Sequence, residues 1–143
     1  MSRNIRMLAM ILGGALSLCM LPKASFGHEG HEHGGALIEE MMTLNNVFRD
    51  VVTGVALGDG ASVHKALEAM HGTMEKTHAG VHEGTVKLRK NAGRLKEFVD
   101  LDQAFHAKLE TLARAAHRND QAEMLSLTKE LLDRCVGCHR DFR

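Results

Sequence analysis

Apolar residues recur every three or four positions along four segments of the chain, which is the spacing of one face of an α-helix. These segments cover residues 37–55, 63–81, 95–116 and 124–142. Ser62 precedes the second segment, and Asn119 and Asp120 precede the fourth, so Ser62 and one of the latter two are the predicted N-caps. The pattern therefore predicts four amphipathic helices.

The segments between these helices are short. "GDG" at 58–60 and "RND" at 118–120 have the composition of turns, whereas residues 83–93 form a basic, irregular connection. No run alternates in the way that is typical of a strand, and the single proline lies near the N-terminus. We therefore predict an all-α fold, an antiparallel four-helix bundle.

The first 27 residues have the pattern of a secretory signal peptide. Arg3 and Arg6 are followed by an apolar stretch of 15 residues, and Ser25 and Gly27 are the small residues expected before a cleavage point. This stretch is too short to cross a bilayer comfortably, which makes an uncleaved membrane anchor the weaker interpretation. We expect export to the periplasm and no membrane attachment after cleavage.

Cleavage after Gly27 also changes the charge of the chain. The removed segment carries three basic residues and no acid, so the formal net charge falls from 0 to −3. An acidic surface gives no support for binding to nucleic acid or to an anionic membrane.

The remaining chain divides into a leader and one domain. Residues 28–34 are polar and rich in glycine and histidine, which predicts a flexible leader, and residues 35–143 contain the four helices. The leader histidines are candidate copper or zinc ligands, although a glycine-rich segment fixes no geometry for them. They are His28, His31 and His33.

Two cysteines and a histidine form the sequence "CVGCH" near the end of the fourth helix. Cys135 and Cys138 are the only cysteines left after the signal is removed, and His139 follows directly. Cys-x-x-Cys-His is the attachment signature of a c-type haem. It predicts one haem c, covalently bound through both cysteines, with His139 as the proximal iron ligand.

Three other interpretations of this motif are weaker. A structural zinc site needs four ligands, and the chain has no second cysteine pair. A thioredoxin-like redox pair belongs to a βαβ setting that the helical pattern lacks. A disulfide across two residues of a helix would strain the helix and close a very short loop.

With this motif and the pattern "MMTLNNVFRDVVTG" of the first helix, residues 35–143 resemble the class II c-type cytochromes, the cytochrome c′ superfamily. The resemblance extends to the terminal "CVGCHRDFR", where Phe142 and Arg143 match an aromatic and a basic residue that typically follow the motif. It implies a secreted bundle with haem at its C-terminal end, and Arg143 as a residue of the haem site. Members are often dimers through their first two helices, which leaves a homodimer open here.

Bundle topology indicates which residues surround the haem. The end of the fourth helix should lie beside the start of the first and third helices and the end of the second. Met41, Met74 and Phe98 are therefore expected near the porphyrin. Low-spin members of the superfamily use a methionine of the first helix as the sixth iron ligand, which implies Met41, while Met42 is one residue out of phase. A vacant sixth position and a histidine ligand stay open.

The sequence favours a periplasmic electron carrier with His139 and Met41 as axial ligands and redox proteins as partners. It offers no base, nucleophile or second cofactor site that would define an enzyme. The alternative is a five-coordinate protein that binds nitric oxide or carbon monoxide, as other members of the superfamily do. A metal-handling protein that uses the histidine-rich leader is a third interpretation.

Overall fold

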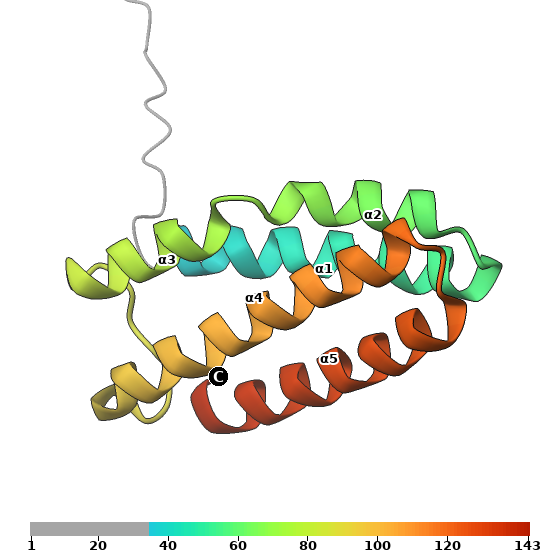
Figure 1. Ribbon diagram of the computed structural model, residues 1–143. Helices are drawn as coiled ribbons and strands as arrows, with labels where there is room; N and C mark the ends of the chain where they lie inside the picture. Colours follow the sequence, from blue (N-terminus) through green and yellow to red (C-terminus); the bar gives the residue numbers. More distant parts are fainter. Residues whose placement is uncertain (1–34) are drawn as a thin grey trace, which may run out of the picture.

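The computed structural model describes residues 35–143, which form a helical bundle (Figure 1). The helical elements are α1 Gly35–Leu57, α2 Gly60–Leu67, η1 Glu68–Met70, α3 Thr73–His82, η2 Ala92–Arg94, α4 Leu95–His117 and α5 Gln121–Phe142. The four sides of the bundle are α1, α2 together with α3, α4, and α5. These described residues include no strand, and the predicted four-helix bundle is confirmed. The predicted signal peptide and leader lie outside the described residues.

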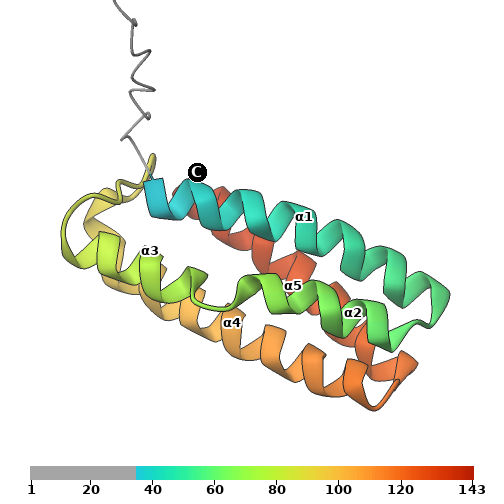
Figure 2. The same ribbon diagram turned by 90° about the horizontal axis from the view of Figure 1, so that it is seen from above.

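The second predicted helix is interrupted in the structure. After α2 and the short turn η1, His71 is extended and Gly72 has a left-handed backbone with φ of 78°. Glycine adopts this conformation without the steric cost that a Cβ would add. The apolar spacing continues from Val63 to Val81 across the break, so the pattern alone predicted one continuous helix. Both halves pack against α1 (Figure 2).

The caps of two helices follow from short acidic side chains. Asp120 accepts a hydrogen bond from the backbone N–H of Glu123 at 3.0 Å, which confirms it as the cap of α5. The predicted Ser62 cap is wrong. Asp59 caps α2 instead and accepts from the N–H of Ser62 at 3.0 Å, because the helix begins at Gly60.

Two apolar clusters fill the bundle. The main cluster joins α1, α2, α4 and α5, and its largest fully buried side chains include Leu112, Met124 and Leu131. A smaller cluster, which we call the end cluster, has Leu88, Phe98 and Phe142 at its centre.

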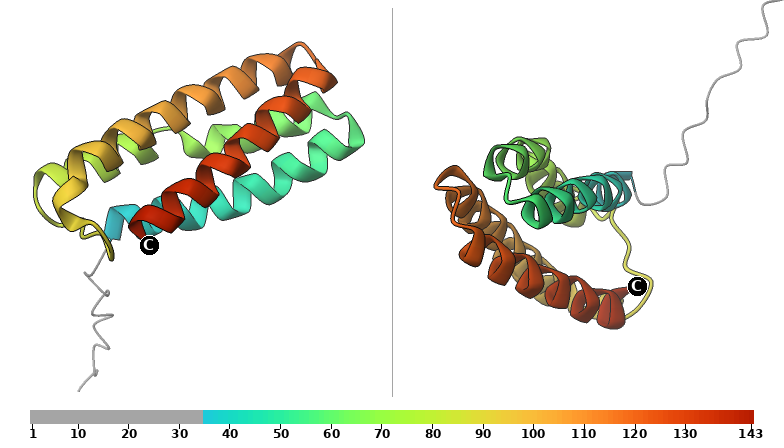
Figure 3. Two further views of the ribbon diagram at one scale, coloured as in Figure 1. Left: turned by 90° about the horizontal axis from the view of Figure 1, so that it is seen from below. Right: turned by 90° about the vertical axis from the view of Figure 1, so that its right-hand side faces the viewer.

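The connection between α3 and α4 is attached to the end of α5. The N–H of Lys90 donates to the carbonyl oxygen of Phe142 at 3.3 Å, and Asn91 Nδ2 donates to that of Asp141 at 2.7 Å. The start of α1, the end of α3, the start of α4 and the end of α5 therefore meet at one end of the bundle (Figure 3). No helix within residues 35–143 is long and apolar enough to span a membrane.

The opposite end of the bundle depends on the small size of Gly60. Its N–H donates to Asn119 Oδ1 at 2.8 Å, and an added Cβ would lie 2.6 Å from that oxygen and even closer to the carbonyl of Ala116. Gly60→Ala should therefore lower the free energy of unfolding by about 1–3 kcal/mol, the usual cost of overpacking. Chemical denaturation measures this, with Gly93→Ala as control because a Cβ there meets nothing within 4 Å. Equal losses in both variants would contradict the close packing.

Candidate functional site

The two cysteines of α5 lie where the two apolar clusters meet. Cys135 packs against the main cluster and Cys138 against the end cluster, and both thiols are free and half-buried. Residues three apart lie on the same face of a helix, which explains why both side chains point toward the interior. The structure therefore presents two thiols, one helical turn apart, to an apolar environment.

Burial affects the chemistry of these thiols. It raises the pKa of Cys135, and it raises the pKa of Cys138 to about 11 with a further contribution from the negative charge of Asp102. Both side chains are consequently neutral thiols near neutral pH. Redox-active Cys-x-x-Cys pairs have lowered thiol pKa values instead, so the environment argues against a thioredoxin-like pair.

The other predicted haem-site residues differ in exposure. Phe98 is buried in the end cluster with Cys138, and its ring meets that of Phe142 edge to face at 5.8 Å. His139 and Arg143 are exposed at the last turn of α5. Met41 on α1 and Met74 on α3 are half-buried. The structure thus brings Phe98 and Cys138 into one cluster.

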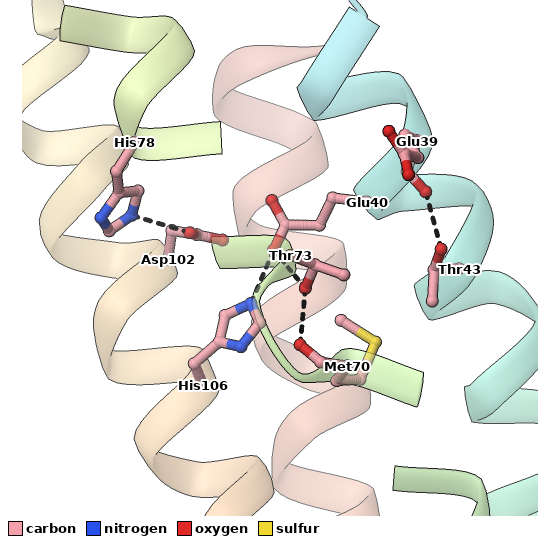
Figure 4. Close-up of polar contacts among 8 residues, drawn as sticks. All are labelled: Glu39, Glu40, Thr43, Met70, Thr73, His78, Asp102 and His106. Carbon is pink, nitrogen blue, oxygen red and sulfur yellow. Dashed lines mark hydrogen bonds and ion pairs between the residues drawn. The ribbon is translucent and has the colours of Figure 1, made fainter. Parts of the chain in front are cut away.

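One buried acid, on α1, was not predicted from the sequence. Glu40 is 1% exposed, and its Oε1 accepts a hydrogen bond from His106 Nε2 at 2.7 Å (Figure 4). Thr73 Oγ1 lies 3.3 Å from the same oxygen. Burial opposes ionisation of Glu40, but the hydrogen bond and the positive charge of His106 outweigh it and lower the pKa. Burial also opposes protonation of His106, whose pKa is nevertheless raised by its contact with Glu40 and by the charge of Asp102.

A second buried pair lies next to the first. Asp102 Oδ2 is 2.9 Å from His78 Nε2, and the aspartate side chain is 6% exposed (Figure 4). Burial and the neighbouring charge of Glu40 raise the pKa of Asp102 to about 6. The pairing could not be predicted from the sequence, because His78 and Asp102 are 24 residues apart and lie on different helices.

The burial of Glu40 had a weak signal in the sequence. The buried positions of α1 are Glu40, Val47, Val51, Gly54 and Val55. Glu40 and Val47 each come one residue before a position of the predicted face, Met41 and Phe48, whereas Val51 and Val55 belong to both sets. A charged residue among the apolar positions of a helix is buried only when it has a partner. The partner of Glu40 is His106, which lies 66 residues away in the sequence, so the burial could not be predicted from local spacing.

The bundle and its terminal motif together define a class of protein. A Cys-x-x-Cys-His sequence at the end of the last helix, with half-buried thiols facing apolar side chains and a histidine at the next position, fits the attachment of haem. These are the features of a helical c-type cytochrome.

Comparison with known proteins identifies the family. The model of the family described as Cytochrome C' matches residues 35–143, and the chain therefore belongs to the cytochrome c′ family. This family implies a haem c cofactor, and its members are typically exported. No curated protein and no solved structure gave a significant match to the chain.

Proposed function

We propose that the protein is a periplasmic mono-haem c-type cytochrome that transfers electrons and catalyses no reaction itself. The proposal depends on one observation above all, the Cys135, Cys138 and His139 motif at the last turns of α5 in a member of the cytochrome c′ family. A bound haem supplies one-electron exchange between ferrous and ferric iron. Redox proteins are the proposed partners, and we propose no contact with nucleic acid or membrane.

The residues of the chain would hold the haem and limit its contact with water. Cys135 and Cys138 would form the two thioether bonds, and His139 would ligate the iron from one side. The buried rings of Phe98 and Phe142 support an apolar, rigid setting at this end of the bundle, and the guanidinium of Arg94 lies 5.4 Å from the Phe142 ring. A rigid, apolar protein environment favours electron transfer because its structure changes little between the ferrous and ferric states, which keeps the reorganisation energy low.

Met41 is the proposed second axial ligand. It is half-buried on the first turns of α1, at the end of the bundle where α5 also ends, whereas the neighbouring Met42 is 65% exposed (Figure 3). Met74 and Arg143 are proposed as further residues of the haem site. Thioether ligation favours a higher reduction potential, as suits a carrier.

Met41→Ala tests this assignment. If Met41 is the ligand, the wild-type ferric protein should be low spin and show the weak charge-transfer band of sulfur bound to iron, and carbon monoxide should bind slowly because a ligand must leave first. The variant should lose the band, become high spin and bind carbon monoxide faster by at least tenfold. Absorption spectra in both oxidation states and stopped-flow mixing measure these changes.

Met42→Ala is the matched control, since it removes the same side chain from the next position. It should leave the spin state and the rate of carbon monoxide binding unchanged. A wild-type protein that is already high spin and binds gas without delay would replace the electron carrier by the alternative function, binding of nitric oxide or carbon monoxide.

A further inference from the structure

Three potential metal ligands from α1 and α4 converge inside the bundle. Glu40 from α1 and Asp102 and His106 from α4 each offer one ligand atom, and these atoms lie within 4.8 Å of one another. We call these three residues the carboxylate–histidine cluster. Figure 4 shows the side chains of Glu40 and His106 pointing toward each other, with the Asp102 carboxylate beside them.

Two further polar atoms at this place are buried without a partner. Glu40 Oε2 makes no hydrogen bond, although its side chain is completely buried. Thr77 Oγ1 also makes none, and Thr77 is 0% exposed. The Thr77 hydroxyl lies close enough to the Glu40 carboxylate to favour its ionised form and to lower its pKa, but the two groups do not have the geometry of a hydrogen bond. An unsatisfied buried polar atom destabilises the fold, so the free Oε2 of Glu40 marks a place where a ligand would be favourable.

We propose that Glu40, Asp102 and His106 bind a divalent first-row transition metal ion, separate from any haem iron. The free Oε2 of Glu40 would become a ligand atom instead of an unpaired acceptor. His106 would release its proton and bind the ion as a neutral imidazole, and the divalent ion would take over the compensation of the buried Glu40 and Asp102 charges that the histidine provides without metal. Carboxylates and histidines on facing helices are a known way to build metal sites in the core of four-helix bundles.

The donor set selects the class of ion. Two oxygens and one imidazole nitrogen are ligands that Zn²⁺ accepts in sites with three protein ligands and one further position. Ca²⁺ needs six to eight oxygen ligands, and Mg²⁺ keeps a nearly complete octahedron of oxygens, so neither suits this cluster. His78 would act as a positioning residue, because its Nε2 lies 2.9 Å from Asp102 Oδ2 and fixes the carboxylate.

Zinc binding to the haem-loaded protein tests the proposal. After treatment with a chelator, the protein should bind one zinc ion per chain tightly in isothermal titration calorimetry. Glu40→Gln and Asp102→Asn should each weaken this binding by at least about 100-fold. His78→Gln should weaken it by about 10- to 100-fold, the usual effect of removing a group that orients a ligand. Unchanged affinity in Glu40→Gln or Asp102→Asn would overturn the site.

The control is a second pair of histidine and glutamate that is exposed. His64 Nδ1 lies 3.9 Å from Glu68 Oε1 on the surface of the bundle. Glu68→Gln removes the same charge as Glu40→Gln but outside the cluster, so it should leave the affinity unchanged. A loss in Glu68→Gln equal to that in Glu40→Gln would mean that zinc responds to general charge, and would overturn the proposal.

X-ray absorption at the zinc edge gives an answer that does not depend on any variant folding. With one zinc ion per wild-type chain, the spectrum should fit nitrogen and oxygen ligands at about 2.0–2.2 Å, with outer scattering from one imidazole. Two or more imidazoles would assign the zinc to exposed or leader histidines and overturn the proposal. So would a wild-type protein that retains no zinc after dialysis.

Discussion

Replacing both Cys135 and Cys138 by serine should release the haem from the polypeptide when the purified protein is extracted with acidified organic solvent. In the wild-type protein, two thioether bonds should keep the porphyrin on the chain under the same treatment. The expected effect is complete, because no cysteine other than these two remains after the predicted cleavage of the signal. Absorption of the protein and solvent phases measures the distribution of the haem.

The single variants provide the control. Cys135→Ser and Cys138→Ser should each keep the haem on the protein through one bond, and the α band of the pyridine complex should move to longer wavelength as each vinyl group stays unsaturated. His139→Ala should retain the covalent haem but change the spectrum of the iron. Free extraction of haem from correctly matured wild-type protein would contradict covalent attachment.

The sequence predicted the order and approximate limits of the four helical stretches, because periodic burial dominates the stability of an amphipathic bundle. The structure begins the third predicted helix at Leu95, as expected, and caps α5 with Asp120. The break at Gly72 was not predicted, because the apolar residues before and after it keep the same spacing. A left-handed glycine followed by a new helix depends on how both halves pack on α1, which a local pattern does not contain.

The sequence also predicted only those parts of the candidate site that depend on residues close together in the chain. Cys135, Cys138 and His139 lie within five residues of one another, so their spacing alone predicted the attachment of haem. Glu40 and His106 meet because α1 and α4 both pack against α3 and α5, so that their side chains reach each other in the interior of the bundle. Hydrophobic periodicity assigned the position beside Glu40, Met41, to the interior. A buried carboxylate needs a partner from another element, and a single sequence does not show which one it is.

The two buried polar pairs, Glu40 with His106 and Asp102 with His78, affect the stability of the fold as well as the binding of ligands. Glu40 and His106 form an ion pair whose side chains are 0% and 11% exposed. Removing both charges from water is costly, so the pair stabilises the fold only as long as both partners are present. Asp102 adds a third group whose ionisation is opposed by burial and by the charge of Glu40.

Glu40→Ala should therefore lower the free energy of unfolding by about 3–5 kcal/mol, the usual cost of leaving one member of a buried pair without its partner. The imidazole of His106 would lose its hydrogen bond at 2.7 Å, and Thr73 would lose a neighbouring oxygen. The loss should be measured by chemical denaturation of the haem-loaded protein, with the slope of the transition compared to that of the wild type.

The double variant Glu40→Leu with His106→Leu tests whether the loss comes from the unpaired partner rather than from a cavity. Apolar residues that replace a whole buried ion pair are often neutral or stabilising, so the double variant should be more stable than Glu40→Ala by at least about 2 kcal/mol. Glu39→Ala is the control, since Glu39 is next in the sequence but makes only an exposed ion pair with Lys76 at 3.5 Å, and it should change the stability by less than about 1 kcal/mol. A double variant as unstable as Glu40→Ala would show that the stability of this end of the bundle depends on polar groups as such, and not on their pairing.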